Sequence, residues 1–456
     1  MAGLNKIKTA FFCQNCGHQS LKWLGRCPSC GEWNRFVEEE IGEPADTTGS
    51  RGAGFGGTAL PLASIEADET DRVTTGIVDV DRVLGGGIVR GSAILLGGDP
   101  GIGKSTLLLQ VLQQLAHQGM KVLYISGEES ANQIRLRGKR IGASSQNLLI
   151  LVEVSLENIL RQIREVQPDA VVVDSIQTMY SGSLSSAPGS VGQVRESSEK
   201  LIMMSKQTGI PLFLIGHVTK EGAIAGPRVL EHMVDTVLYF EGDSGHAFRI
   251  VRSVKNRFGP TNEIGVFEMG DDGLREVANP SALFLSERPR CAAGSVVVPS
   301  MEGSRPILVE IQSLVSETTF GIPRRTTIGV DHNRVSLLAA VLEKICGLHL
   351  GNHDIYINVA GGVKLTEPAV DLGIISSIVS SFLNRPVDEG TVLCGEVGLT
   401  GEVRGVGRME SRIREAGRMG FTRCVLPKVG MQERAVGGVV KQVSIENVKD
   451  LPEVLF

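Results

Sequence analysis

The stretch from Gly98 to Thr106, GDPGIGKST, has the residue types and the spacing of a phosphate-binding loop. It matches G-x-x-x-x-G-K-[ST], follows the apolar run SAILLGG and opens an amphipathic helical pattern, which is the context that this motif requires. Its glycines let backbone N–H groups face phosphate oxygens, and the start of the helix adds a partial positive charge. We expect Lys104 to reach the β- and γ-phosphates of ATP and Ser105 to ligate Mg²⁺. The other residues expected around the nucleotide are Gly98, Asp99, Pro100, Gly101, Ile102, Gly103 and Thr106.

Polar residues also end three of the apolar runs that follow this loop. Asp174 ends AVVVD, a pattern in which the carboxylate holds the Mg²⁺ shell. Glu128 and Glu129 follow the run YIS, where a carboxylate could polarise the water that attacks ATP. We favour Glu128 over Glu129, and two solvated acids at a helix start are the alternative. His217 ends PLFLIGH, where it could sense the γ-phosphate or lie satisfied in the core.

Four cysteines near the N-terminus have the spacing of a structural zinc site. The segment CQNCGHQSLKWLGRCPSC carries two Cys-x2-Cys pairs, and each pair can place two thiolates on one tetrahedral Zn²⁺. Four thiolates leave no open position for catalysis, and metal binding contributes roughly 10–16 kcal/mol to the folding of such small units. Unligated cysteines or a redox dithiol are the alternatives. The expected ligands are Cys13, Cys16, Cys27 and Cys30.

The cysteine-rich head is also locally basic. Trp23 and Trp33 lie among its positive charges, and Glu32 is the acid that opposes them. This composition suits either a nucleic acid or a protein partner, and the sequence does not choose between the two. The basic residues are Lys6, Lys8, Lys22, Arg26 and Arg35.

The composition of the 456-residue chain is that of a globular protein. Hydrophobic residues make up 42% and charged residues 21%, and the net charge of -5 gives no general sign of nucleic-acid binding. The sequence has no apolar run of about 18 residues that would predict a membrane span. Its first residues, MAGLNKIKTAFFC, lack the long apolar stretch of a signal peptide. We therefore expect a cytoplasmic protein that does not contact a membrane.

The elements that position these residues can be read from apolar runs that alternate with helical patterns. This alternation predicts a parallel sheet with helices on both of its faces. The runs are SAILLGG (92–98), KVLYIS (121–126), NLLILVEV (147–154), AVVVDSI (170–176) and PLFLIGHV (211–218). The expected organisation is a zinc finger at 1–37, a linker at 38–70, an ATPase domain at 71–280 and a second α/β domain at 285–456.

In this order, the phosphate-binding loop, SGEES, VVVDSIQT and LIGHV resemble the ATPase core of the RecA family. The segment SVKNRFGPTNEIGVFEM (253–269) is similar to one that hexameric helicases of the DnaB type carry near their arginine finger. The tail, from about residue 290 onwards, resembles the Lon protease domain. Together with the four-cysteine head, the chain resembles the RadA (Sms) family of bacterial recombination and repair ATPases over essentially its whole length.

The RadA resemblance assigns a role to the motif KNRFG. Lys255 and Arg257 would alternate along a strand end, where cations could reach the γ-phosphate of a neighbouring subunit or a DNA phosphate. We favour the neighbouring nucleotide for Arg257 and coupling to DNA for Lys255. The motif comprises Lys255, Asn256, Arg257, Phe258 and Gly259.

The Lon-like tail differs from the Lon family at the catalytic positions. That chemistry needs a serine that a lysine deprotonates. By the match, Asp371 stands at the serine position and Glu410 at the lysine position, so the resemblance implies an inactive protease domain that serves ring assembly. Rescue by Ser376, Ser377 or Ser411 would need another geometry. Arginines of one strand–helix unit could add a basic surface for duplex DNA, and they are Arg404, Arg408, Arg412, Arg414 and Arg418.

The resemblance implies a DNA-dependent ATPase that acts on recombination intermediates, by branch migration or helicase-like translocation, with ATP, Mg²⁺ and Zn²⁺ as cofactors. It implies a nucleoid-associated homohexamer on single-stranded and branched DNA. Further partners would be a recombinase filament and, through the zinc finger, a replicative helicase or another repair protein. DNA-facing loops would be 181–193 and 219–232, with Lys220 and Arg228 as candidate contacts. The competing interpretations are a non-motor ATP-binding regulator of the RecA family and an ATP-dependent protease.

Overall fold

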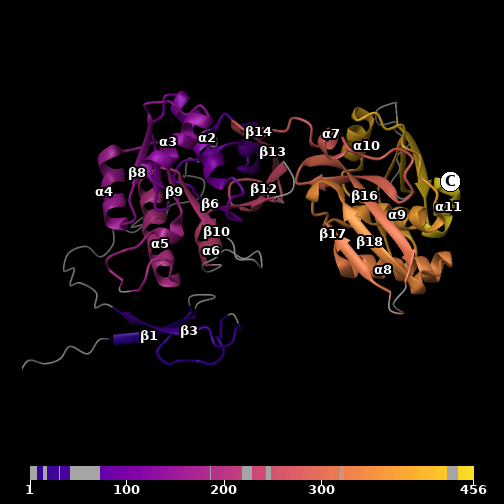
Figure 1. Ribbon diagram of the computed structural model, residues 1–456, viewed down its shortest axis with the longest axis horizontal. Helices are drawn as coiled ribbons and strands as arrows, with labels where there is room; N and C mark the ends of the chain where they lie inside the picture. The colour runs from indigo at the N-terminus through magenta and orange to yellow at the C-terminus, as the bar shows by residue number, and fades with distance from the viewer. Residues whose placement is uncertain are drawn as a thin grey trace, which may run out of the picture. The chain divides into compact units, whose positions relative to one another are not determined.

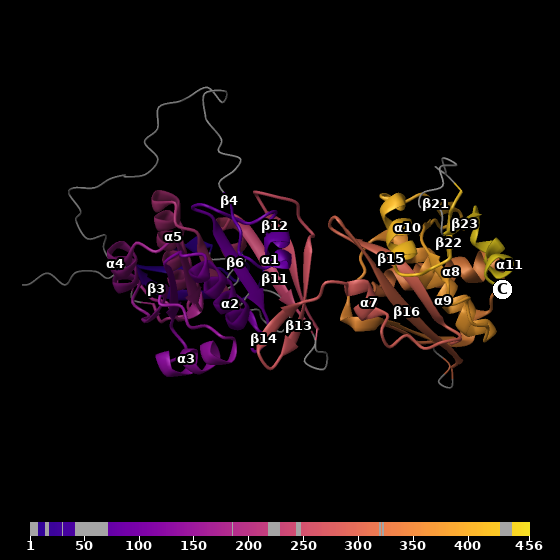
Figure 2. The ribbon, with the colours of Figure 1, turned by 90° about the horizontal axis from the view of Figure 1, so that it is seen from above.

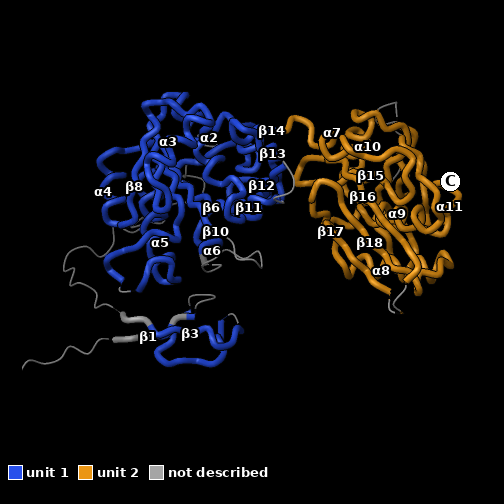
Figure 3. The backbone as a smooth tube through the Cα atoms, in the orientation of Figure 1, with its two compact units in different colours: residues 1–276 blue, residues 277–456 orange. Residues whose placement is uncertain are grey.

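The chain forms two compact units, residues 1–276 and residues 277–456 (Figure 3). They are described separately below. The computed structural model describes residues 8–13, 18–29, 31–41, 72–184, 186–217, 229–242, 248–318, 321, 323–428 and 440–456. None of the helices in these ranges combines the length and the apolar character needed to cross a bilayer. The division of the chain into four segments with the boundaries expected above stays a prediction.

The cysteine-rich head folds as a small antiparallel sheet in the order β2-β1-β3. Its strands are β1 (Lys8–Cys13), β2 (Gln19–Ser20) and β3 (Phe36–Ile41). Cys13, Cys27 and Phe36 are buried in its core, and Phe11 and Leu24 pack against them. Among the described residues of the head, burial of these five side chains gives only a small apolar core, which agrees with a fold that depends on a bound metal.

The rest of the first unit is built on a nine-stranded sheet in the order β14-β13-β12-β11-β6-β10-β9-β7-β8 (Figure 1). The strands from β11 to β8 in this order are parallel, whereas β12, β13 and β14 extend the sheet in antiparallel fashion. The predicted parallel sheet is therefore the central part of a mixed one. The strands are β6 (Ala93–Gly98), β7 (Val122–Ser126), β8 (Leu148–Val152), β9 (Ala170–Asp174), β10 (Leu212–His217), β11 (Thr236–Glu241), β12 (Phe248–Asn256), β13 (Ile264–Gly270) and β14 (Gly273–Glu276). A separate two-stranded ribbon pairs β4 (Arg72–Val73) with β5 (Ile88–Val89).

Helices cover both faces of this sheet. Successive strand residues point to opposite sides, and apolar residues on both sides pack against helices. Ile94 and Leu96 of β6 belong to the apolar core that includes α2, whereas Ala93 and Leu95 belong to the core that includes α4 and α5. This arrangement confirms the predicted fold class. The helices are α1 (Val78–Val83), α2 (Lys104–His117), α3 (Ala131–Arg140), α4 (Leu156–Val166), α5 (Val191–Thr208) and α6 (Val229–Met233).

The second unit contains a seven-stranded mixed sheet in the order β17-β18-β16-β15-β19-β22-β23. Helix α9 packs along β15 and β16 of this sheet (Figure 2). The strands are β15 (Ser295–Glu302), β16 (Arg305–Glu317), β17 (Arg325–Ile328), β18 (His353–Val359), β19 (Thr391–Leu393), β22 (Arg423–Pro427) and β23 (Lys441–Ile445), with a ribbon of β20 (Glu396–Val397) and β21 (Val403–Arg404) beside them. The helices are α7 (Pro280–Phe284), α8 (His332–Cys346), α9 (Asp371–Leu383), α10 (Met409–Arg418) and α11 (Leu451–Leu455).

Candidate nucleotide-binding site

The loop between β6 and α2 has a backbone that only glycine accommodates at its ends. Gly98 and Gly103 have φ angles of 154° and 120°. A Cβ atom at Gly98 would lie 2.6 Å from the carbonyl oxygen of Phe240, and one at Gly103 would lie 2.8 Å from Cε of Met269. At Gly101, whose φ is 78°, a Cβ would meet nothing within 4 Å. The loop is therefore packed tightly at both ends and open in the middle, as a cradle for phosphate groups requires.

Lys104 begins α2 and lies over this loop. Its Nζ donates hydrogen bonds to the carbonyl oxygens of Gly98, at 2.7 Å, and Asp99, at 2.8 Å. Burial lowers the pKa of Lys104, and the nearby Asp174 carboxylate partly opposes that effect. The ammonium group is held by two neutral oxygens, which phosphate oxygens could replace with a gain in charge pairing.

A buried tyrosine links the two residues expected to hold Mg²⁺. The hydroxyl of Tyr124, on β7, donates to Oδ2 of Asp174, at the end of β9. The same phenol is hydrogen-bonded to Ser105. Burial, followed by the negative charge of Asp174, raises the pKa of Tyr124, so the phenol stays protonated as a donor. Ser105 and Asp174 thus share one partner, and their oxygens fit the hard-ligand chemistry of Mg²⁺.

The two candidate acids after β7 have different surroundings. Oε1 of Glu128 accepts a hydrogen bond from Ser175, the residue after Asp174. Glu129 instead pairs with Arg137 of α3. The sequence could not separate the two glutamates, whereas this geometry puts Glu128 beside the expected Mg²⁺ ligands and engages Glu129 elsewhere. Glu128 as the catalytic carboxylate stays a prediction.

Some of the expected positions lie partly or wholly outside the described residues. The backbone of His217 ends β10, where it pairs with Gly98, but its side chain is outside them. Lys220 and Arg228 are outside them as well. The expected loop 181–193 is shorter than predicted, because α5 already begins at Val191.

In the cysteine-rich head, two of the four predicted zinc ligands can be placed. Cys13 ends β1 and Cys27 lies in the loop between β2 and β3, and both are buried. Cys16 and Cys30 lie outside the described residues. The four-thiolate ligand set therefore stays a prediction.

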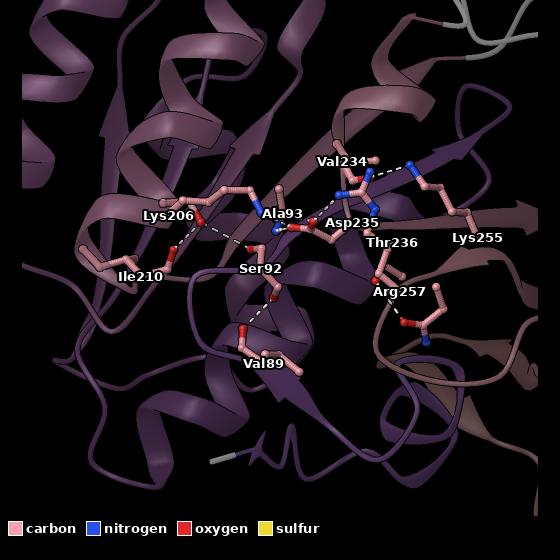
Figure 4. A network of polar contacts seen from close by, with 12 residues as sticks. Val89, Ser92, Ala93, Lys206, Ile210, Val234, Asp235, Thr236, Lys255 and Arg257 are labelled. Atoms are coloured by element: carbon pink, nitrogen blue, oxygen red, sulfur yellow. Dashed lines mark hydrogen bonds and ion pairs between the residues drawn. The ribbon is translucent and has the colours of Figure 1, made fainter. Parts of the chain in front are cut away.

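Lys255 of the KNRFG motif lies at the C-terminal end of α6. Its Nζ donates to the carbonyl oxygens of Glu231 at 2.7 Å and His232 at 3.3 Å. It also donates to that of Val234 at 2.8 Å (Figure 4). A cation at this end of a helix satisfies carbonyls that have no partner within the helix. Burial, followed by the charge of Arg257, lowers the pKa of Lys255. Lys255 thus joins β12 to the short helix that follows residues 218–228 in the chain.

Arg257 is anchored to Asp235, a residue that the sequence did not single out (Figure 4). The strand β12 ends at Asn256, so Arg257 lies one residue beyond the strand on which it was expected. Its backbone N–H donates to the carbonyl oxygen of Asp235 at 3.1 Å, and its Nη1 lies 3.4 Å from Oδ1 of that residue. The Asp235 side chain is 2% exposed and that of Arg257 is 55% exposed. The guanidinium is therefore held at one edge and open to solvent at the other.

The other members of the motif shape the turn after β12. Oδ1 of Asn256 accepts from the backbone N–H of Phe258 at 2.9 Å, and Arg72 donates to the carbonyl oxygen of Phe258. A Cβ at Gly259 would lie 2.8 Å from the Cα of Gly85, so the two backbones touch. These three residues position the turn from which Arg257 projects.

In the second unit, the position that matches the Lon serine holds a buried ion pair. Asp371 begins α9 and is 1% exposed. Arg334 of α8 donates to both of its oxygens, with a 2.8 Å bond from Nε to Oδ1, and the backbone N–H of Val397 donates to Oδ2 at 3.1 Å. This pair borders a pocket of about 510 Å³. Glu410 lies on α10 and is exposed to solvent.

Two of the three serines considered for a rescue of protease chemistry are engaged elsewhere. Ser376 donates to the carbonyl oxygen of Leu372 at 2.6 Å, and Ser377 donates to that of Ile374 at 2.8 Å. Both hydroxyls are buried within α9. Each hydroxyl thus donates to a carbonyl oxygen of its own helix, and neither of these two hydrogen bonds involves a basic side chain.

The expected basic surface of this unit is only partly formed. Arg412 is 2% exposed and makes a bidentate pair with Glu367, with bonds of 2.7 and 2.6 Å. Arg404 pairs with Glu402, and Arg418 pairs with Glu415. The sequence placed these arginines in one strand–helix unit, with Arg404 on β21 and Arg412 and Arg418 on α10, but could not reveal that Arg412 faces the core. The prediction that Arg412 contributes to a DNA-binding surface is wrong.

Comparisons with known proteins agree with this geometry. Family models match residues 61–223 as an AAA domain, residues 11–38 as a rubredoxin metal binding domain and residues 312–430 as subunit ChlI of Mg-chelatase. The chain thus carries an ATPase domain, which implies ATP, and a zinc ribbon that spans the four cysteines.

Curated relatives match over nearly the whole chain. The protein named DNA repair protein RadA from Bacillus subtilis is 54% identical over 452 residues, which cover 98% of each chain. The protein of the same name from Listeria monocytogenes is 53% identical over 443 residues, which cover 97% of each chain. Among solved structures, a KaiC-like protein from Pyrococcus horikoshii is similar at 23% identity, over 45% of this chain and 98% of that one, with a TM-score of 0.39.

Substitution of Tyr124 by Phe should weaken nucleotide binding only when Mg²⁺ is present. The change removes the hydroxyl that donates to Asp174 and contacts Ser105, and it leaves the core filled. A lost hydrogen bond to a charged group corresponds to a decrease in affinity of roughly tenfold. Titration with a fluorescent ATP analogue, with Mg²⁺ and with EDTA, measures it. Tyr180→Phe, at a half-exposed tyrosine, is the control. An equal loss under both conditions would contradict the role of Tyr124.

Proposed function

The chain belongs to the RadA family of DNA repair proteins, and we propose that it is a DNA-dependent ATPase that works as a ring on recombination intermediates. The observation that carries this proposal is that Lys104, Asp174 and Glu128 meet at one sheet edge, while the same sheet carries Lys255 and Arg257 at the end of β12. The residues that hydrolyse ATP and those that respond to DNA would then be carried by the same sheet. On this proposal the protein moves along single-stranded or branched DNA by helicase-like translocation or branch migration.

In hydrolysis, Lys104 holds the β- and γ-phosphates after exchanging the carbonyl oxygens of its own loop for phosphate oxygens. Ser105 and Asp174 hold Mg²⁺, which neutralises phosphate charge when bound. Glu128 lies beside Asp174 through Ser175 and orients the attacking water. Tyr124 fixes the direction of the Asp174 carboxylate by donating to it.

DNA acts on this chemistry through α6. The chain between β10 and α6 carries Lys220 and Arg228, which we propose as DNA contacts. Lys255 holds the last carbonyls of α6, so a displacement of that helix is passed to the end of β12. Arg257 follows two residues later and, in a hexamer, would complete the charge around the γ-phosphate of the adjacent subunit.

The second unit contributes assembly and has no peptidase activity in this proposal. Its Asp371 is neutralised by Arg334, and Glu410 is solvent-exposed on another helix, so neither a nucleophile nor a base stands at the Lon positions. A hexameric ring would place this unit's surfaces against its neighbours. A recombinase filament on the same DNA is the partner that we propose for the ring.

Substitution of Lys104 by Ala should abolish ATP hydrolysis and its stimulation by single-stranded DNA. Removing the charge that holds the transferring phosphate lowers kcat by roughly 100-fold or more. Phosphate release measured with and without an oligothymidine is the assay, and Lys139→Ala, at an exposed lysine of α3, is the control. A normal kcat in Lys104→Ala would remove the assignment of the loop, and an ATPase that ignores DNA would contradict the proposed function.

Substitution of Arg257 by Ala should leave ATP binding unchanged and slow hydrolysis by roughly 10³-fold or more, as loss of an arginine supplied in trans does. Mixing this variant with Lys104→Ala subunits should restore part of the activity, because an intact phosphate-binding loop then meets an intact arginine. Arg275→Ala, at an exposed arginine paired with Asp272, controls for loss of charge. The trans role would be ruled out if the ATPase activity of the mixture were no more than the sum of the two separate variants and Arg257→Ala had lost its DNA affinity.

Unfolded casein incubated with the protein and ATP should remain intact for hours. Asp371→Ser should not create peptidase activity, because the lysine that would activate the serine is replaced by the exposed Glu410. Gel electrophoresis of the substrate is the measurement, and an active Lon protease is the positive control. Cleavage that disappears when one particular serine is changed would overturn this conclusion.

A further inference from the structure

The cysteine-rich head exposes large aromatic side chains. Trp23 is 53% exposed and Trp33 is 65% exposed, and the neighbouring Leu21 is 82% exposed. Tryptophan buries more surface than almost any other residue when it packs, so two half-solvated indoles on one small unit are uncommon. Neither ring belongs to the core around Cys13, Cys27 and Phe36. Their exposure therefore does not serve the folding of the head.

The two indoles lie on the same side of Gly25. A Cβ at Gly25 would lie 3.7 Å from Cζ3 of Trp23 and 4.0 Å from Cζ3 of Trp33, so both rings approach a residue that has no side chain. An antiparallel bridge between Arg26 and Trp33 and a 2.8 Å bond from the Cys27 N–H to the Glu32 carbonyl oxygen hold the two segments together. The rings are thus set by the backbone of the metal-binding loops.

Positive charge surrounds these rings. The guanidinium carbon of Arg26 lies 5.8 Å from the centre of the Trp33 ring, and its Nε is fixed by a 3.0 Å bond to the carbonyl oxygen of Gly31. Lys22 and Arg35 are exposed beside the same two tryptophans in the chain. Between residues 21 and 35 the sequence contains one acid, Glu32. The surface formed by Trp23, Trp33, Lys22, Arg26 and Arg35 is named the aromatic platform below.

We propose that the aromatic platform binds single-stranded DNA by stacking unpaired bases on its two indoles. The reason is chemical complementarity: a single strand offers flat base faces and a phosphate at every nucleotide, which match exposed rings interleaved with cations. In a duplex the base faces are covered by their neighbours, so the platform distinguishes single strands without reading sequence. This inference rests on the proposed function and adds to it a DNA contact on the zinc-binding head, separate from the ATPase sheet.

The chain contains only two tryptophans, both in the platform, so intrinsic tryptophan fluorescence reports on this surface alone. Zinc-loaded full-length protein is titrated with an oligothymidine without nucleotide. The anisotropy of a labelled oligothymidine is measured in parallel. Stacking should quench the tryptophan fluorescence, and the quenching and the anisotropy increase should have the same midpoint. An anisotropy increase without quenching would overturn the platform and leave the proposed function standing. No anisotropy change would overturn the platform, and stimulation of phosphate release by the oligothymidine would then decide on the proposed function.

Variants test which feature of the platform matters. Trp33→Ala should weaken oligothymidine binding roughly tenfold, and Trp33→Phe, which keeps a ring, should recover most of that loss. Leu21→Ala removes an exposed apolar side chain that cannot stack and should change the affinity less than twofold. Zinc content by metal analysis shows that each variant retains its fold. Equal losses in Trp33→Phe and Trp33→Ala, or unchanged affinity in both, would contradict stacking and favour a protein as the partner of this surface.

Discussion

A carboxylate removed from water has to be neutralised, and this requirement at Asp235 organises the part of the sheet that carries Arg257. Its Oδ2 accepts from the backbone N–H of Ala93 at 3.1 Å, and Lys206 of α5 lies 3.0 Å from the same oxygen. Nη1 of Arg257 lies 3.4 Å from the other carboxylate oxygen, Oδ1. One buried charge therefore binds three parts of the sheet: the start of β6, helix α5 and the turn after β12. Because Lys206 alone can balance that charge, Arg257 could leave Asp235 without stranding it.

The same principle operates at the other end of the parallel strands. Asp174 is nearly buried, and its stabilising partners are the Tyr124 hydroxyl and the positive field of Lys104. Lys104 is itself buried and depends on loop carbonyls and on Asp174 for compensation. Each group is thus satisfied in a way that a phosphate and a divalent cation could improve. The hydrogen bond from Tyr124 to Asp174 need not break when ligands bind, so it preorganises this carboxylate.

The fold and the phosphate-binding loop could be predicted because they depend on signals that are local in the sequence. A strand, a glycine loop and a helix N-terminus are adjacent in the chain, so GDPGIGKST fixes its own geometry, and apolar runs mark the strands of the sheet. The contacts of Arg257 with Asp235 and of Lys255 with α6 join residues more than twenty positions apart, and no spacing rule signals them. Likewise, helical spacing showed that the arginines of α10 share an element, but only packing decides that Arg412 turns inwards.

Asp371 shows how a buried carboxylate is held at the position that matches the Lon serine. The position lies in the first turn of a helix, where a negative charge is favoured by the unpaired backbone N–H groups. Once Arg334 and the Val397 N–H satisfy both oxygens, the carboxylate is neither a nucleophile nor a free base. Removing it would leave the Arg334 cation without its partner, which is costly in a half-buried setting. The pair therefore stabilises the unit at the position that matches the Lon serine.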